Sequence, residues 1–170
     1  MGRGTKSTAF LMECMADALI RLMSEKPFEK ISINEITAEA GVGRSTWFRN
    51  FADKNDVLTF KLIRLWERWA EDHDIQVRDR YTIENARDFF TFNFEYRDIL
   101  KTLYNANLQP AVYNAFYKIM VLRHDVDTDE RYSAKFYSYG LFGLLDEWIR
   151  RDYAEPVDKL VEIVKRLADK

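Results

Sequence analysis

Residues 32–54, SINEITAEAGVGRSTWFRNFADK, constrain the fold more than any other stretch of the chain. Ser32 and Glu35 stand three positions apart at the start of an apolar helical pattern, which is the spacing of a capping box. Gly41 follows the last apolar position of that pattern, and glycine readily takes the left-handed conformation that often ends a helix. Val42 comes next and is expected to pack between this helix and a following one. The stretch therefore predicts two short helices joined by a glycine turn.

The second of these helices, from about residue 43 to residue 50, has an apolar side and a polar side. Trp47 and Phe51 are four positions apart, so their side chains lie on one face and would pack onto the first helix. At about 100° per residue, Arg49 points almost directly away from that face. The outward surface therefore carries side chains that are free to bind another molecule.

The chemistry of this outward surface favours double-stranded DNA. A recognition helix in the major groove offers its N-terminal residues to base edges. Arg44 and Arg49 can donate to guanine O6 and N7, or to a phosphate, and Phe48 can contact a thymine methyl group. Ser45, Thr46 and Lys54 suit phosphates, which fix the register of the protein on the duplex. The predicted DNA-binding residues are Ser32, Gly43, Arg44, Ser45, Thr46, Phe48, Arg49, Asn50 and Lys54.

Residues 6–66 resemble the DNA-binding domain of the TetR family of bacterial transcriptional regulators. The matching string is EKPFEKISINEITAEAGVGRSTWFRNFADKNDVL, residues 25–58. It contains the family's A-G-V at the turn, as residues 40–42, and its T-hydrophobic-aromatic-x-x-F-x-x-K run, as residues 46–54. The rest of the chain is similar to the family in being helical and of suitable length. The resemblance implies a two-fold dimer that binds DNA, with an inducer pocket in its C-terminal part.

Three residues depart from the family pattern. Phe48 stands where tyrosine is usual, so the hydroxyl that commonly bonds a phosphate is absent. Gly43 stands where serine or threonine is common, which predicts a weaker cap for the second helix. Trp47 is bulkier than the usual leucine or phenylalanine, so the core beneath it must be adapted.

Apolar spacing typical of helices runs through the rest of the chain and predicts an all-α fold of about nine helices. Residues 1–53 are expected to form an N-terminal three-helix, helix-turn-helix DNA-binding domain. A long fourth helix, residues 54–73, links the two domains, and residues 54–170 form a helical ligand-binding and dimerisation domain. The remaining helices are expected at about residues 6–25, 83–95, 98–105, 110–124, 129–151 and from 156 onward.

Taken for the whole chain, the charge argues against DNA binding, because the protein carries −2 at pH 7. In residues 1–60 the Lys and Arg residues only balance the Asp and Glu residues. The charges are segregated, however, because residues 1–12 contain no acid and residues 41–54 are mostly basic. We therefore expect a small basic surface, modest non-specific affinity and strong salt dependence.

Other function classes have little support in the sequence. No apolar run reaches the ~18 residues needed to span a membrane, and no charged-then-apolar N-terminus indicates export. Cys14 is the single cysteine, which excludes an internal disulfide and fits a reducing cytoplasm. His73 and His124 have no second ligand at metal-binding spacing. No catalytic Ser-His or Cys-His pair and no glycine-rich nucleotide motif is found, so we predict no enzyme activity, catalytic residue, metal, cofactor or membrane partner.

The middle of the chain is rich in aromatic residues, which predicts an apolar ligand cavity between helices. Phe89 and Phe92 share a helical face, as do Tyr113 and Phe116. For any single residue, packing in the core is the simpler interpretation. Together they suit a ligand site, which is mostly apolar with a few placed polar groups. The predicted pocket residues are Phe89, Phe92, Asn93, Tyr96, Tyr104, Tyr113, Phe116, Tyr117, His124 and Tyr137.

Two C-terminal segments have apolar surface suited to a dimer. Residues 139–145, YGLFGLL, are apolar all round a helix and therefore need burial on more than one side. Gly140 and Gly143 are three positions apart and permit the close approach of another helix. A second interpretation is that both C-terminal helices simply cover the core of the protomer. The predicted dimer-interface residues are Tyr139, Gly140, Phe142, Gly143, Leu160, Val164 and Leu167.

These patterns lead to one main hypothesis for the function. The chain is expected to be a dimeric transcriptional regulator, most simply a repressor that a small apolar or aromatic effector releases from a palindromic operator. One alternative is a helical enzyme or small-molecule-binding protein that keeps the helix-turn-helix as a scaffold. Another is a regulator controlled by a protein partner.

Overall fold

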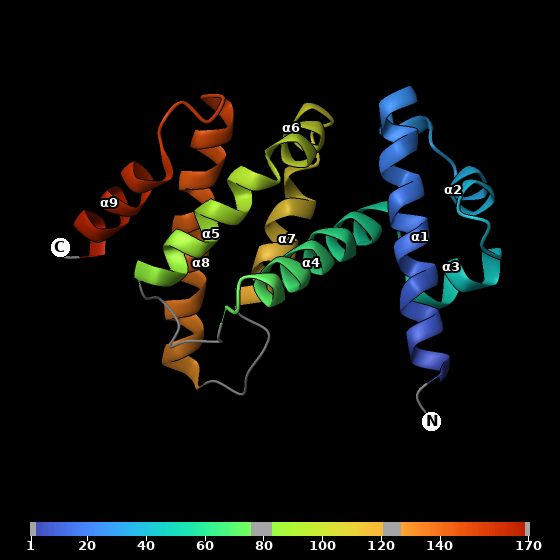
Figure 1. Ribbon diagram of the computed structural model, residues 1–170, viewed down its shortest axis with the longest axis horizontal. Coiled ribbons are helices and arrows are strands. Elements are labelled where there is room, and N and C mark those ends of the chain that lie inside the picture. Colours follow the sequence, from blue (N-terminus) through green and yellow to red (C-terminus); the bar gives the residue numbers. More distant parts are fainter. Residues whose placement is uncertain (1–2, 76–82, 121–126, 169–170) are drawn as a thin grey trace. The chain divides into compact units, whose positions relative to one another are not determined.

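The computed structural model describes residues 3–75, 83–120 and 127–168, and all the regular structure in these residues is helical (Figure 1). This confirms the predicted all-α fold. None of the described helices is long and apolar enough to cross a membrane. The helices are α1 (Arg3–Glu25), the 3-10 helix η1 (Phe28–Lys30), α2 (Ile33–Glu39), α3 (Arg44–Asn50), α4 (Lys54–Asp72), α5 (Ile83–Glu95), α6 (Arg97–Asn105), α7 (Gln109–Met120), α8 (Thr128–Arg150) and α9 (Val157–Ala168).

The chain divides into two compact units, Met1–Arg64 and Leu65–Lys170. The division falls inside α4, whereas the sequence prediction places the domain boundary where that helix begins. α4 begins where expected because Asp53 caps it, its Oδ1 accepting a hydrogen bond of 2.9 Å from the backbone N–H of Asp56. The first turns of α4 therefore belong to the N-terminal unit.

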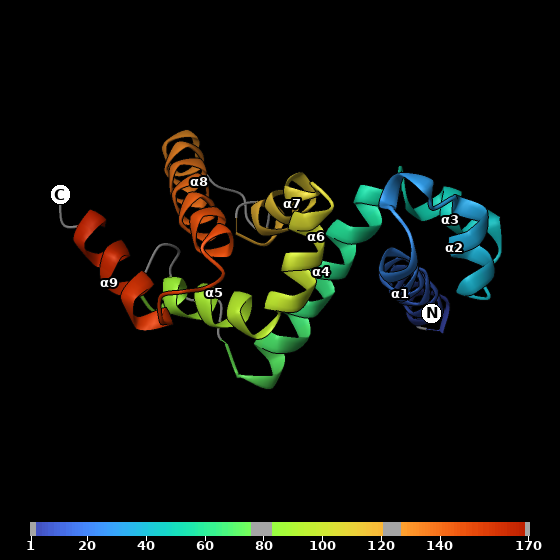
Figure 2. The same ribbon diagram turned by 90° about the horizontal axis from the view of Figure 1, so that it is seen from above.

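In the N-terminal unit, α1 packs against both α2 and α3 (Figures 1 and 2). Met15 and Leu19 from α1, Ile36 from α2 and Trp47 from α3 are all fully buried. Phe51, which follows α3, is 5% exposed, and its ring centroid lies 5.5 Å from that of Trp47. The apolar faces that the sequence predicts for these three helices therefore meet in one core.

Two ion pairs also join α1 to the first turns of α4. Lys61 Nζ donates to Asp17, and Arg64 Nε donates to Glu13 Oε1 over 2.9 Å. Because these side chains are partly exposed, each pair contributes little to the free energy of unfolding. Their consequence is geometric, since they fix α4 alongside α1 within this unit.

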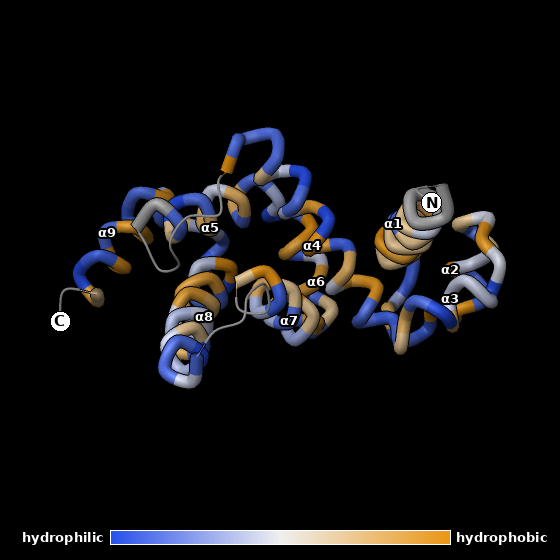
Figure 3. The backbone as a smooth tube through the Cα atoms, turned by 90° about the horizontal axis from the view of Figure 1, so that it is seen from below, coloured by the Kyte–Doolittle hydropathy of each residue, from blue (hydrophilic) through white to orange (hydrophobic). Residues whose placement is uncertain are grey.

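In the C-terminal unit, α5 packs against α9, and α7 packs against α6 and α8. An ion pair of 2.6 Å between Arg87 and Asp158 adds a polar link between α5 and α9. Hydrophobic and hydrophilic positions alternate along these helices, as amphipathic helices require (Figure 3). The largest fully buried side chains in this core include Phe90, Phe92, Leu100, Leu103 and Trp148.

Polar side chains and left-handed residues set the helix ends in this unit. Asp127 caps α8, with Oδ1 accepting from the backbone N–H of Glu130 over 2.9 Å. Asp152 and Tyr153 follow α8 with φ of 56° and 57°, a conformation that non-glycine residues seldom adopt. The buried Trp148 supports this turn, because its Nε1 donates to the Glu155 carbonyl oxygen over 2.9 Å.

The burial of Trp47 yields a stability prediction. Trp47→Ala should lower the free energy of unfolding by about 3–5 kcal/mol, the usual cost of deleting a fully buried large side chain. Its indole N–H is buried without an acceptor among the described residues. Trp47→Phe removes that unpaired donor and should therefore cost much less.

Urea denaturation of the full chain measures both variants. Phe10→Ala is the matched control, because Phe10 lies in the same unit and is 66% exposed. Its effect should stay within about 0.5 kcal/mol. An equal loss for Trp47→Ala and Phe10→Ala would contradict the central place of Trp47 in the core.

Candidate nucleic-acid interface

A capping box fixes the start of α2, as the sequence predicts. The backbone N–H of Glu35 donates to Ser32 Oγ over 3.3 Å, and the backbone N–H of Ser32 donates to Glu35 Oε2 over 2.9 Å. Lys26, from the end of α1, also bonds the Glu35 carboxylate. The hydrogen bond from Lys26, followed by those from Ser32, lowers the pKa of Glu35 to about 2. Ser32, a predicted DNA-binding residue, is exposed at this helix start.

The turn between α2 and α3 follows the predicted glycine geometry. Gly41 has a φ of 65°, in the left-handed region that glycine tolerates. The backbone N–H of Val42 donates to the Thr37 carbonyl oxygen over 2.9 Å, and the Val42 side chain is 8% exposed. An open depression beside this turn is lined by Asn34, Thr37, Ala38, Gly41, Val42 and Arg44.

Helix α3 leaves most of its predicted DNA-binding side chains exposed, while Trp47 is buried. Gly43 is its N-cap residue and makes no side-chain cap, as expected from the missing hydroxyl. The α3 side chains that the sequence predicts to bind DNA divide by exposure: Arg44, Ser45, Phe48 and Arg49 are exposed, whereas Thr46 and Asn50 are half-buried. Asn50 Nδ2 donates to the Thr46 carbonyl oxygen over 2.7 Å, so it also stabilises the helix.

Phe48 and Arg44 lie together on the outer face of α3. Phe48 is 61% exposed, an unusual position for a phenylalanine side chain. The Arg44 Cζ atom lies 5.7 Å from the centroid of the Phe48 ring, within the range of a cation–π contact. The two residues are one helical turn apart and form one surface.

Lys54 is engaged in the N-terminal unit rather than directed outward. Its Nζ donates to the carbonyl oxygens of Phe28 and Ile31, the latter over 2.8 Å. The same ammonium group lies 4.3 Å from the centroid of the Phe28 ring. Partial burial lowers the pKa of Lys54. The side chain that the sequence assigns to a phosphate thus satisfies the backbone at the end of η1.

The sequence gives no local signal for two of these contacts. Lys26 reaches Glu35 from the segment that follows α1, and Lys54 reaches Phe28 and Ile31 from α4. Only the folded unit brings these residues together. Both cations stabilise the segment between α1 and α2, on which the position of α2 depends.

Part of the predicted ligand pocket forms a packed aromatic cluster. Phe89, Phe92 and Phe116 are at most 4% exposed, and their rings meet edge to face. Tyr96 stands next to Phe92, with ring centroids 4.8 Å apart. Asn93 is fully buried, and its Nδ2 donates to the Phe89 carbonyl oxygen over 2.7 Å. We name these five residues the interior cluster, since their side chains fill the space between α5 and α7.

Other predicted pocket residues lie on α7 and α8. The Tyr113 ring contacts those of Tyr117, Tyr139 and Phe142, and the Tyr113–Tyr139 centroids are 4.7 Å apart. Burial raises the pKa of Tyr113 to about 12, so its hydroxyl stays neutral. We name these four residues the α7–α8 cluster. It joins residues predicted for the pocket to residues predicted for the dimer interface.

Two other predicted pocket residues, Tyr104 and Tyr137, lie apart from these clusters. Tyr104 is buried on α6 beside Asp146, and burial, followed by the charge of Asp146, raises the pKa of Tyr104. Tyr137 is 37% exposed and packs on Phe136. His124 lies outside the described residues. The structure therefore does not gather all the predicted pocket residues in one place.

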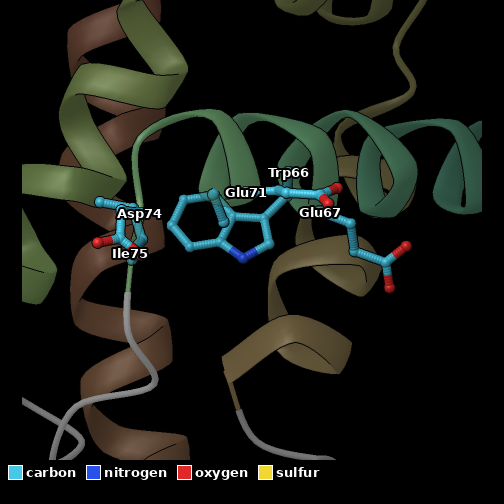
Figure 4. Close-up of a pocket in the computed structure, with 6 residues that line it drawn as sticks. Trp66, Glu67, Glu71, Asp74 and Ile75 are labelled. Atoms are coloured by element: carbon cyan, nitrogen blue, oxygen red, sulfur yellow. The ribbon is translucent and has the colours of Figure 1, made fainter.

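A cavity of about 300 Å³ lies at the C-terminal end of α4, and none of its lining residues belongs to the predicted pocket set (Figure 4). Among the described residues, no group of three His, Cys, Asp or Glu side chains is placed to hold a metal ion. Trp66 lines this cavity, and its ring contacts that of Phe92, with centroids 5.2 Å apart. The cavity therefore adjoins the interior cluster. The cavity is lined by Trp66, Glu67, Ala70, Glu71, Asp74 and Ile75.

Most predicted dimer residues are exposed on the protomer. Tyr139 and Leu167 are each 56% exposed, and Phe142 and Val164 are half-buried. Gly140 and Gly143 have open space where a Cβ atom would stand, so nothing in the protomer requires glycine there. Leu160 differs, because it is 4% exposed on the helix that packs against α5. It is therefore part of the protomer core.

Sequence reasoning missed two aromatic residues on α8. Tyr132 and Phe136 are 75% and 76% exposed. With Tyr139 and Gly143 they follow the helical spacing of four, three and four positions, so they continue the same face. We name these four residues the α8 stripe. Their spacing was available in the sequence, but their exposure depends on how α8 packs.

Comparisons with known proteins agree with this architecture. Residues 16–59 match the model described as bacterial regulatory proteins, tetR family, and residues 82–170 match the model described as transcriptional regulator C-terminal region. The crystal structure of Lin0861 from Listeria innocua aligns with a TM-score of 0.71 at 17% identity, covering 96% of this chain and 91% of that chain. This likeness shows a shared fold.

A second solved structure is more distant. The fatty acid degradation regulator FadR from Bacillus halodurans aligns with a TM-score of 0.48 at 16% identity, covering 92% of this chain and 93% of that chain. No functionally curated protein matches the chain. The first family model covers the helix-turn-helix, and the second covers more than half of the whole chain. The chain belongs to the TetR family of bacterial transcriptional regulators.

Proposed function

We propose that this DNA-binding regulator is a cytoplasmic homodimeric repressor, released from a palindromic operator by a small apolar or aromatic effector. The observation that carries the proposal is the outer face of α3. Arg44, Phe48 and Arg49 are exposed on that face, while Trp47 is fully buried on the side that packs onto the core. A helix held in this way can enter the major groove with its specific side chains foremost.

The division of DNA contacts follows from the chemistry of these side chains. Arg44 and Arg49 can each bond guanine O6 and N7 with two parallel N–H groups. Ser32, Gly43, Ser45, Thr46 and Asn50 surround them and offer hydroxyl, amide or backbone donors to phosphates. With a whole-chain charge of −2, binding relies on this small local surface. Affinity should therefore fall steeply with salt.

Pairing of two copies would supply the second recognition helix, which binds the other half of the operator. The α8 stripe exposes two aromatic side chains that are each at least 75% accessible, Tyr132 and Phe136. Such a row of apolar residues is typical of a surface that another helix covers. A second copy of α8 would bury it in an isologous interface, with the open space at Gly140 and Gly143 allowing close approach. A two-fold dimer reads two half-sites, so the operator should be a palindrome.

An effector would act by shifting the balance between two arrangements of the DNA-binding units. The aromatic interior cluster around Phe92 is the proposed effector site, and the cavity beside Trp66, which is lined also by Glu67, Glu71 and Asp74, adjoins it. A ligand shifts such a balance only by its difference in affinity for the two arrangements. An effector that binds here is therefore expected to weaken operator binding without touching α3.

The first prediction concerns the two arginines of α3. Arg44→Ala/Arg49→Ala should weaken binding to the operator by at least about 30-fold, since each bidentate arginine–guanine pair contributes about 1–3 kcal/mol. Gel-shift titration against the promoter region of the chain's own gene measures this loss. Lys30→Ala is the control, because it removes an exposed cation from the same unit. If the wild-type chain gave no specific shift, the scaffold alternative would replace this proposal.

The second prediction distinguishes two roles for Lys54. Lys54→Met keeps the aliphatic stem but removes the donors to Phe28 and Ile31. Without DNA, it should lower the free energy of unfolding by about 1–2 kcal/mol, the lower part of the range for charged hydrogen bonds because the side chain is partly exposed. The slope of log affinity against log salt should not change. A slope reduced by about 0.9 would instead show a phosphate contact.

The third prediction concerns the α8 stripe. Phe136→Glu should convert the dimer to a monomer, because an interface that buries this side chain would then bury an unpaired carboxylate. Sedimentation velocity measures the mass against the 20.3 kDa of one chain. Phe10→Glu is the matched control, since it makes the same change at a 66% exposed phenylalanine of the N-terminal unit. A wild-type chain that stays monomeric at micromolar concentration while binding its operator would contradict the dimer.

A further inference from the structure

The contact between Arg44 and Phe48 joins a hydrogen-bonding group to an apolar one on the DNA-binding face. The guanidinium carbon lies 5.7 Å from the ring centroid, and the ring is 61% exposed. Both residues belong to the seven-residue helix α3, which the buried Trp47 holds in place. An extended arginine loses side-chain entropy on binding, and a ring that already holds it reduces that loss.

The base edges of the major groove match such a pair. Guanine presents two acceptors, O6 and N7, to a bidentate arginine, and thymine presents an apolar methyl group. Neighbouring bases on one strand are about 3.4 Å apart along the helix axis, so the two features lie side by side. A phenyl ring has no donor for a phosphate, whereas its edge suits a methyl group.

We propose that Arg44 and Phe48 together recognise a guanine beside a thymine, with Phe48 contacting the thymine 5-methyl group. This inference rests on the proposed binding of α3 in the major groove, and it adds the base step that the helix selects. Phe48 is then a specificity-determining residue, and Arg44 reads the guanine next to it. The guanidinium of Arg44 suits the two acceptors of guanine, and the ring of Phe48, which has no donor for a phosphate, suits the thymine methyl group.

Deoxyuridine substitution gives a direct test, because it removes the thymine methyl group and leaves every hydrogen-bonding group in place. The wild-type protein first selects its operator from a random duplex pool. Each thymine of that operator is then replaced by deoxyuridine, one at a time, and the dissociation constant is measured. We expect a symmetric pair of thymines, each beside a guanine, whose replacement weakens binding about fourfold, the effect of losing contact with one methyl group.

The same scan with Phe48→Ala assigns the methyl contact to the ring. At the sensitive thymines this variant should bind the thymine and deoxyuridine operators equally. Phe10→Ala, which removes an exposed phenylalanine elsewhere in the unit, should keep the fourfold difference. Arg44→Lys should relax the guanine preference at the neighbouring position, since lysine lacks the bidentate fork.

The outcomes separate the two proposals. Failure of the wild-type chain to select any duplex sequence would overturn the proposed operator binding itself. Specific binding with no methyl-sensitive thymine beside a guanine would overturn the Arg44–Phe48 inference alone. If Phe48→Ala still bound the deoxyuridine operator more weakly than the thymine operator, the Arg44–Phe48 inference would also be overturned. If circular dichroism shows that Phe48→Ala is folded but it binds no DNA, the deoxyuridine scan of the wild-type protein alone decides whether the inference holds.

Discussion

The burial of Trp47 is the interaction on which the DNA-binding unit depends. α3 has only seven residues, and helices this short are marginal in water without tertiary contacts. Gly43 gives it no side-chain cap, so packing of Trp47 and Phe51 onto the core supplies most of its stability. The same packing determines which side chains face outward. One buried indole therefore fixes both the existence of the helix and the direction of its recognition surface.

A second constraint concerns the use of positive charge. Lys26 bonds Glu35 at the capping box, and Lys54 bonds the backbone carbonyls at the end of η1. These cations hold the connection between α1 and α2 and are not directed at a ligand. Phe48 removes a further phosphate donor by replacing the usual tyrosine hydroxyl. Fewer phosphate contacts would leave base contacts, and the pairing of two copies in the proposed dimer, to supply a larger share of operator affinity.

The sequence predicted those features that depend on neighbouring residues. The capping box at Ser32, the left-handed Gly41 and the outward arginines each follow from spacing within one or two helical turns. The sequence did not predict the features that depend on tertiary packing. Lys54 reaches carbonyl groups more than twenty positions away, and Leu160 is buried because α9 packs on α5. No local pattern records such contacts, so the aromatic residues could be counted but not divided into clusters.

The separation of the aromatic residues into two clusters indicates how effector binding would be coupled to the proposed dimerisation. Tyr113 belongs to the set predicted for the pocket, yet its ring contacts Tyr139 and Phe142 of the set predicted for the interface. A ligand that moves α7 would thus displace side chains next to the α8 stripe. Coupling between two binding equilibria is reciprocal, so in the proposed dimer, dimerisation would change effector affinity by the same factor as the effector changes dimerisation. We expect the α7–α8 cluster to couple the two equilibria, because its side chains belong to both predicted sites.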